Sequence, residues 1–161
     1  MSYLVLREFA PLVVVHRHAP AYPLGTATML ATVDRLLSEA IDRHRRLALI
    51  YDAANIDPIG GSTRRLLGEW LRDPHGLLAR GATSLDLVHR SPLTRGVLEA
   101  VLWLRKPPVR GLVHERREQA VESALASLRQ AGLEPPPRLA SGGDAVLAAR
   151  IRELLARPGT E

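Results

Sequence analysis

The sequence predicts an α/β domain with a mostly parallel sheet, one antiparallel edge strand, helices packed around the sheet and an additional C-terminal helix. Three observations lead to this fold class. Short apolar runs alternate with stretches whose apolar residues recur at the helical period. The run Leu47–Tyr51 is apolar throughout, as expected for a strand covered on both faces. The first two extended runs are joined only by Ala10 and Pro11, a connection that suits an antiparallel pair.

Strands are expected where β-branched and aliphatic residues cluster between turn residues. The expected strands are Tyr3–Phe9, Leu12–His18, Leu47–Tyr51, Ser84–Val88 and Leu112–His114. Helices are expected where the apolar residues follow a period of 3.6. The expected helices run from Thr26 or Thr28 to about His44, from Ser62 to about Arg72, from Ser91 to Leu104, from Arg116 to Ala131 and from Asp144 to about Ala156.

Two features mark helix ends. Ser91 is followed by Pro92, a pair that is typical of a helix start. The serine side chain accepts a hydrogen bond from a free backbone N–H of the first turn, and proline has no backbone N–H that needs a partner. The cations of Arg43–Arg46 follow the first helix. Because cations at the end of a helix interact favourably with its dipole, this position favours a structural role over a nucleic-acid patch.

The chain divides into three expected parts. Residues 1–132 form the α/β domain, residues 133–143 a linker rich in proline and glycine, and residues 144–157 an amphipathic helix. The apolar stripe of that helix either docks back on the domain or binds a partner, which includes a second copy of the chain.

Composition narrows the function classes. The 161 residues carry a net charge of +5 and no cysteine, which excludes disulfides and thiol catalysis. The arginines are spread along the chain and aromatic residues make up 4 %, so nucleic acid is not an expected partner. Arg7 and Glu8 interrupt the first apolar run, and no apolar stretch is long enough to span a bilayer. We therefore expect a cytoplasmic protein without a membrane span, metal or cofactor.

The turn before the second helix is the main candidate site. Gly60 and Gly61 permit close backbone approach, and the helix start exposes N–H groups that attract an anion. Arg64 and Arg65 add positive charge, although no Gly-Lys-Ser/Thr follows, so this is not a Walker loop. The alternative is an ordinary cap by Ser62. The predicted binding residues are Asp57, Gly60, Gly61, Ser62, Thr63, Arg64 and Arg65, together with Ser91 and Arg95.

Other polar residues support weaker hypotheses. Asp52, His89 and His114 follow successive strands, where they could transfer protons or serve as turn residues. His16 and His18 share one face of a strand, so they could hold a metal or flank Arg17 in solvent at the end of an edge strand.

Two tryptophans occupy the second and third expected helices. We expect both Trp70 and Trp103 to pack in the core. The run Val101–Leu104 is apolar enough to form an interface patch instead.

The element order, with the strand Leu47–Asp52 leading into a turn and a helix at Gly60–Leu67, resembles a STAS domain over roughly residues 3–132. This is the SpoIIAA-like fold of bacterial anti-sigma-factor antagonists. In that family a loop reading Asp-Ser-Ser-Gly-Leu follows the strand, and it corresponds here to Gly60–Arg64. Gly61 stands in place of the phosphorylated serine, so Ser62 or Thr63 is the hydroxyl that remains.

The resemblance implies a non-enzymatic regulatory module. Its partner would be a kinase-like or signalling protein, or a second copy of the chain. Phosphorylation or anion binding at Gly60–Thr63 would switch it. A related, lipid-binding branch of the fold implies the alternative, which is a domain that binds a small anionic or lipid ligand.

Overall fold

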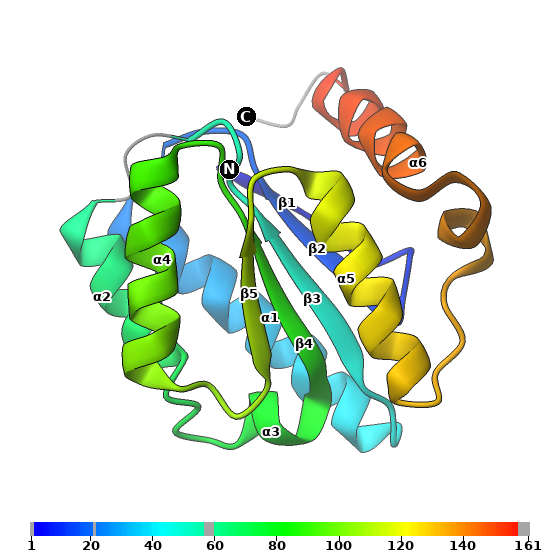
Figure 1. Ribbon diagram of the computed structural model, residues 1–161, viewed down its shortest axis with the longest axis horizontal. Coiled ribbons are helices and arrows are strands. Elements are labelled where there is room, and N and C mark those ends of the chain that lie inside the picture. Colours follow the sequence, from blue (N-terminus) through cyan, green and yellow to red (C-terminus); the bar gives the residue numbers. More distant parts are fainter. Residues whose placement is uncertain (1, 21, 57–59, 158–161) are drawn as a thin grey trace.

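One mixed sheet forms the centre of the molecule, and helices cover both of its faces (Figure 1). The computed structural model describes residues 2–20, 22–56 and 60–157. The strands are β1 (Tyr3–Leu6), β2 (Leu12–Arg17), β3 (Leu47–Asp52), β4 (Ala82–Val88) and β5 (Arg110–His114). The helices are α1 (Pro23–Asp42), α2 (Gly61–Trp70), α3 (Leu77–Gly81), α4 (Pro92–Arg105), α5 (Arg117–Gln130) and α6 (Pro137–Leu155).

The strands lie in the sheet in chain order, β1-β2-β3-β4-β5. β1 pairs antiparallel with β2, and every later pair is parallel. The predicted α/β class, with a mostly parallel sheet and an antiparallel edge, is therefore confirmed, and so is the C-terminal helix. Each parallel connection leads to the next strand in the same direction across the sheet. The helices of these connections, α1 to α4, therefore lie on one side of the sheet.

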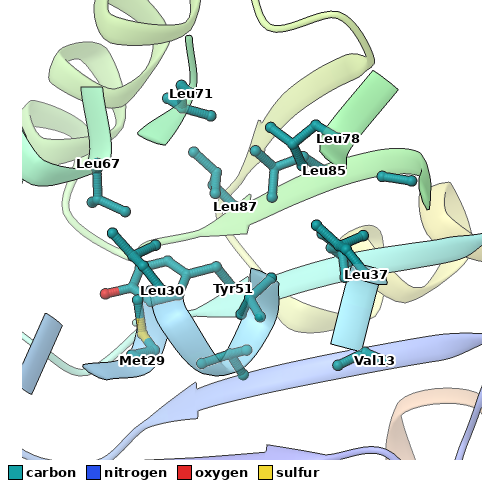
Figure 2. Packing of buried hydrophobic residues seen from close by; sticks show 14 of the residues in the cluster. Val13, Met29, Leu30, Leu37, Tyr51, Leu67, Leu71, Leu78, Leu85 and Leu87 are labelled. Carbon is teal, nitrogen blue, oxygen red and sulfur yellow. The ribbon is translucent and has the colours of Figure 1, made fainter. Parts of the chain in front are cut away.

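Alternating residues of the strands build two separate cores. One face packs against α1 to α4 and includes Leu49. Val13 and Leu87 of the same face are labelled in Figure 2. The other packs against α5 and α6 and includes Val14 and Ile50. Consecutive strand residues therefore serve different layers, and this alternation decides which polar side chains meet near the strand ends.

Several expected boundaries differ from the structure. β1 ends at Leu6 and not at Phe9, since the chain needs residues 7–11 to reverse direction before β2. α1 begins at Pro23, without a side-chain cap from a threonine, because proline at the first turn has no N–H to satisfy. α2 is capped by the Gly60 backbone, so the expected Ser62 cap is wrong. The predicted Ser91 cap is confirmed by its acceptance of the Thr94 N–H at 3.4 Å.

The segment 133–143 is largely helical. Only residues 133–136 precede α6, which begins at Pro137 and bends at Gly143. Proline is common both in extended linkers and at the first position of a helix. Pro137 begins the helix here. Leu139, Leu147 and Ile151 are buried in the core on the α5 side, so α6 docks on its own chain.

Candidate functional site

The carboxyl ends of the parallel strands gather most of the buried polar side chains. His16 of β2 lies beside Asp52 of β3, and Asp52 lies beside Val88 of β4. Val88 in turn lies beside His114 of β5. Ligands of open α/β sheets bind at this edge, and here polar groups lie on both faces of it.

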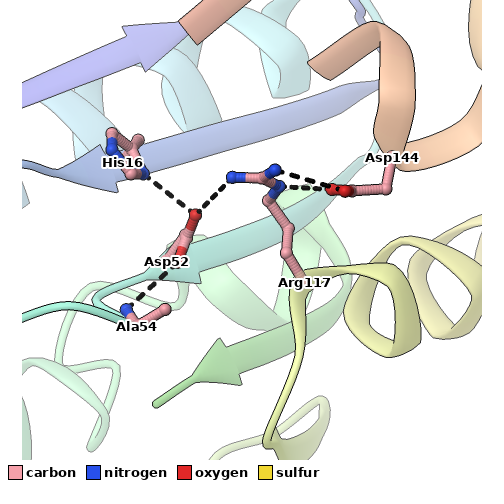
Figure 3. A network of polar contacts seen from close by, with 5 residues as sticks. All are labelled: His16, Asp52, Ala54, Arg117 and Asp144. Atoms are coloured by element: carbon pink, nitrogen blue, oxygen red, sulfur yellow. Dashed lines mark hydrogen bonds and ion pairs between the residues drawn. The ribbon is translucent and has the colours of Figure 1, made fainter. Parts of the chain in front are cut away.

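On the α5 face, Asp52 is the centre of a polar network (Figure 3). Its carboxylate is 1 % exposed and accepts hydrogen bonds from His16 Nδ1 at 2.9 Å and from the Ala54 N–H at 3.1 Å. Arg117 donates to it at 3.2 Å and also pairs with Asp144 of α6. Burial alone would raise the pKa of Asp52, but His16, the Ala54 N–H and Arg117 outweigh it, and the pKa is lowered. The network joins β2, β3, α5 and α6.

A hollow of about 360 Å³ lies over this network. Its lining contains cations and carboxylates in equal number, which are Arg90, Arg116 and Arg117 and Asp52, Glu115 and Glu118. Since these opposite charges offset one another within the hollow, it has no net preference for an anion.

The three residues considered for proton transfer belong to different clusters among the described residues. Asp52 binds His16 and Arg117, whereas His114 donates to Asp86 at 2.8 Å. Asp52 and His114 lie two strands apart, which is roughly 10 Å. His89 donates from Nε2 to the Ile56 carbonyl and accepts the Ser91 N–H at Nδ1. Each has a structural partner of its own.

On the opposite face, the side chain of Arg17 is completely buried. It is 0 % exposed, and no ion pair between described residues includes it. Its Nη1 donates to the Met29 sulfur at 3.9 Å, while its Nε and Nη2 have no hydrogen-bond partner in the described part of the chain. A charge that is buried without a partner destabilises the folded state, so Arg17 is held here at a cost in stability.

Tyr51 lies beside the same guanidinium. Burial raises the pKa of the Tyr51 phenol, and the positive charge of the nearby Arg17 only partly opposes this shift. The hydroxyl is therefore neutral at physiological pH and is able to donate a hydrogen bond. Met29 and Tyr51 lie close together at one end of the core cluster (Figure 2).

An apolar cavity of about 40 Å³ opens beside Met29 and Tyr51. One water needs about 10–15 Å³ of such space, so the cavity exceeds a single water. It is lined by Val15, Met29, Leu30, Val33, Leu49, Ile50, Tyr51, Leu67, Trp70, Leu71, Leu85, Leu87, Leu98 and Val101. Its walls are almost entirely hydrocarbon, which suits an aliphatic group better than water.

Two threonine hydroxyls complete this region. Thr26 lies one turn before Leu30 on α1, and Thr63 one turn before Leu67 on α2; both leucines line the cavity. Both threonines are 0 % exposed, and neither Oγ1 has a hydrogen-bond partner among the residues described. Arg17, Thr26 and Thr63 do not line the cavity themselves, but Arg17 contacts Met29, which does. We call the apolar cavity together with these neighbouring polar side chains and Tyr51 the Arg17 cavity.

The predicted turn residues separate into exposed and buried groups. Gly60, Gly61, Ser62 and Arg64 are exposed. Arg65 is exposed and pairs with Glu69 at 2.9 Å, so it serves its own helix, whereas Thr63 faces inward. Asp57 lies outside the described residues.

The second part of the predicted site is used for local structure. Ser91 caps α4, and Arg95 donates to the carbonyls of His89 and Arg90 and lies 3.7 Å from Glu115. These contacts fix the loop between β4 and α4.

Two expectations about exposure are wrong. β2 lies between β1 and β3, so His16 and Arg17 are buried inside the sheet and are not solvent-exposed on an edge. Burial, with the charges of His16 and Arg17, lowers the pKa of His18. Trp103 is 75 % exposed and is not in the core; it lines a shallow hollow beside Gly111 and Leu112 of β5. Trp70 is partly buried against the core, as expected.

Sequence reasoning missed Arg17, Tyr51 and Thr26 as functional candidates. Strand periodicity was the available signal, because Val13, Val15 and Arg17 share one face and both valines are buried. The sequence contained no comparable signal for Arg117, which reaches Asp52 across 65 positions.

Comparison with protein-family models, curated proteins and solved structures finds no match to this chain. No helix in the described ranges combines the length and apolar character that crossing a bilayer requires. Within the same ranges, no three or more histidine or acidic side chains are grouped so as to hold a metal ion.

Proposed function

We propose that the chain is a non-enzymatic regulatory module of STAS-like fold that binds a small, partly apolar anion in the Arg17 cavity. The observation that carries the proposal is the buried guanidinium of Arg17, whose Nε and Nη2 have no hydrogen-bond partner within residues 2–20, 22–56 and 60–157. Burying a charge without a partner costs several kcal/mol, and a bound anion would offset that cost. The adjoining hydrocarbon walls would enclose the apolar part of the same ligand.

Thermal unfolding in the presence of defined probes tests this function. We expect hexanoate, hexyl sulfate or dibutyl phosphate to raise the melting temperature, and hexanol at the same concentration to leave it unchanged. A ligand at one hundred times its dissociation constant stabilises the folded state by about 2.7 kcal/mol, which such a scan detects readily. Equal stabilisation by hexanol would show that charge is not recognised.

A pair of arginine variants provides the control. Arg17→Met removes the buried charge but keeps an unbranched apolar side chain, so the empty variant should be at least as stable as the wild type. It should no longer respond to the anions. Arg64→Met removes an exposed cation of α2 and should respond like the wild type. An anion response that survives in Arg17→Met would contradict the proposal.

A protein-docking function is the second candidate, and the exposure of Trp103 favours it. Trp103 and Leu104 of α4 are 75 % and 66 % exposed, and exposed aromatic residues often anchor partners. Arg105 and the exposed Lys106 follow Leu104 directly at the end of α4. This end of the helix therefore offers an apolar and cationic surface to a regulatory partner.

Affinity capture from the source cell's extract tests the docking function. Trp103→Ser should lose a stoichiometric partner that the wild type retains. Leu24→Ser is the matched control, because Leu24 is 80 % exposed on a different helix. Equal capture by all three proteins would exclude Trp103 as the anchor.

Phosphorylation would act on Ser62 in this proposal. Ser62 is the exposed hydroxyl of the turn, whereas Thr63 is buried. Phosphosite mapping by mass spectrometry after incubation with candidate kinases should find Ser62 modified. An unmodified turn would leave docking without this switch.

A further inference from the structure

We propose that two copies of the chain form a symmetric dimer through the free edge of β5, with the Trp103 side chains of the two copies meeting across the two-fold axis. The dimer does not depend on ligand binding in the Arg17 cavity. It rests on the docking function, because it names a second copy of the chain as the partner that Trp103 anchors.

The outer edge of β5 carries backbone groups that face away from the sheet. In the described part of the chain, β5 is the last strand of the sheet and pairs only with β4. The His114 carbonyl accepts the His89 N–H at 3.0 Å, so the N–H and C=O of His114 face β4. Because successive residues of a strand direct these groups to opposite sides, those of Leu112 also face β4, and those of Gly111 and Val113 face outward. An antiparallel strand of a second copy would pair with these outward groups.

Apolar side chains flank this edge on both faces of the sheet, which are covered by α4 and α5 (Figure 1). Trp103 of α4 is 75 % exposed and lines a hollow of about 500 Å³ along β5. Leu112 is 39 % exposed and pairs with Asp86, on the face that α5 covers. At the opposite edge of the sheet, Tyr3 and Leu6 of β1 are buried. β5 is therefore the edge that offers an apolar contact to a second copy.

A two-fold axis at Leu112 uses the outward groups of both copies. It pairs Gly111 of one copy with Val113 of the other. It also places Leu112 opposite Leu112 in a non-hydrogen-bonded pair, where the side chains of antiparallel strands approach most closely. Trp103 lines the hollow beside Gly111 and Leu112, so the same axis brings the two tryptophans together on the other face. Each copy contributes the same patch, as in most dimers of identical chains.

The charges on either side of Trp103 favour a second copy as the occupant. Glu99 lines the same hollow four residues before Trp103, and the exposed Lys106 follows three residues after it at the end of α4. At a rise of about 1.5 Å per residue, Glu99 and Lys106 lie roughly 6 Å and 4.5 Å from Trp103 in opposite directions along the helix. A two-fold axis beside Trp103 therefore places Glu99 of each copy opposite Lys106 of the other. No ion pair between described residues includes either side chain.

Sedimentation velocity on the full chain tests the dimer. We expect the wild type to sediment with twice the mass of one chain at micromolar concentration. Trp103→Ser should weaken the dimer at least tenfold, because it removes a central aromatic anchor. Leu24→Ser alters a similarly exposed residue of α1 and should not weaken it. A dimer that Trp103→Ser does not weaken would overturn the proposal. A monomeric wild type that captures a different protein through Trp103 would also overturn it but would leave the docking function in place.

Charge reversal tests the two-fold arrangement. Glu99→Lys and Lys106→Glu each place like charges opposite one another in a dimer of identical chains, so each variant alone should associate at least tenfold more weakly at low salt. A mixture of the two variants should form a heterodimer, because each of its contacts joins opposite charges. A mixture that associates no better than the separate variants would contradict the arrangement.

Amide hydrogen exchange tests the strand pairing. The amides of Gly111 and Val113 should be protected in the wild-type dimer and unprotected in monomeric Trp103→Ser, whereas the amide of Leu112 should be protected in both. Trp103 is shielded only in the dimer, so acrylamide should quench Trp70→Phe strongly in dilute solution and less as the protein concentration rises. Equal exchange of the outward amides in both proteins would show that the copies do not pair through β5.

Discussion

Arg117 Nη1 lies 3.2 Å from Asp52 Oδ2, so the first residue of α5 neutralises the last residue of β3. The same guanidinium pairs with Asp144, which follows the bend of α6 at Gly143. A single side chain therefore fixes both outer helices to the sheet. This relationship gives the first prediction.

Arg117→Met should lower the free energy of unfolding by about 2–3 kcal/mol, because it leaves two carboxylates without their cation, one of them fully buried. Urea unfolding followed by circular dichroism measures the change. Arg129→Met, on the exposed side of the same helix, is the control and should change stability by less than about 0.5 kcal/mol. Equal effects of the two substitutions would show that the network is not stabilising.

Asp52 should make the protein sensitive to acid. Its pKa is lowered in the folded state, so the unfolded chain binds more protons as the pH falls. The stabilisation is fully present above the ordinary aspartate pKa of about 4 and is lost as the pH falls below it, through the lower folded-state pKa. The unfolding free energy of the wild type should therefore fall more steeply below about pH 4 than that of Asp52→Asn. Glu118→Gln, on the surface, should keep the steep dependence.

Two glycines of one helix–strand pair should respond oppositely to alanine. A Cβ at Gly111 of β5 would lie 2.9 Å from Leu102 Cδ2, so Gly111→Ala should cost about 1 kcal/mol through overpacking. A Cβ at Gly96 of α4 meets nothing within 4 Å, so Gly96→Ala should stabilise the helix by about 0.5–1 kcal/mol. Thermal and urea unfolding of both variants check the signs. A stabilising Gly111→Ala would mean that α4 does not pack closely on β5.

The two tryptophans should differ in solvent contact. Trp70 donates from Nε1 to Asp34 Oδ1 at 2.7 Å and packs against the core, whereas Trp103 is 75 % exposed. Acrylamide should therefore quench the fluorescence of Trp70→Phe, which retains Trp103, much more strongly than that of Trp103→Phe. Acrylamide is the suitable quencher because it is neutral and the chain carries a charge of +5. Similar quenching of both variants would contradict the placement of α4.

Local patterns predicted most of the fold. The apolar run of β3, the valines of β2 and the Ser91-Pro92 start of α4 each depend on neighbouring residues, so the chain alone reveals them. The boundaries that failed also have local causes. Pro23 begins α1 upstream of the expected start at Thr26 or Thr28, and Pro137 begins α6 within the expected linker, because proline suits both a loop and the first turn of a helix.

The candidate site was only partly predictable. The exposed turn at Gly60, Ser62 and Arg64 followed from glycine and helix-start chemistry, but its function remains a prediction. The Arg17 cavity depends on which layer each strand residue faces and on how closely α1, α2 and α4 approach the sheet. No residue pattern specifies that approach.

The sequence by itself determined the α/β class, the order of the strands and of every helix except α3, and the absence of thiol chemistry, because periodicity and composition are properties of short stretches of chain. Only the tertiary structure decided that Arg17 is buried without a carboxylate partner among the described residues, that Arg117 reaches Asp52 and Asp144, and that Trp103 faces solvent. The physical reason is that burial and pairing depend on which distant segments pack together. The free energy of a charged side chain changes far more with that packing than with its neighbours in sequence.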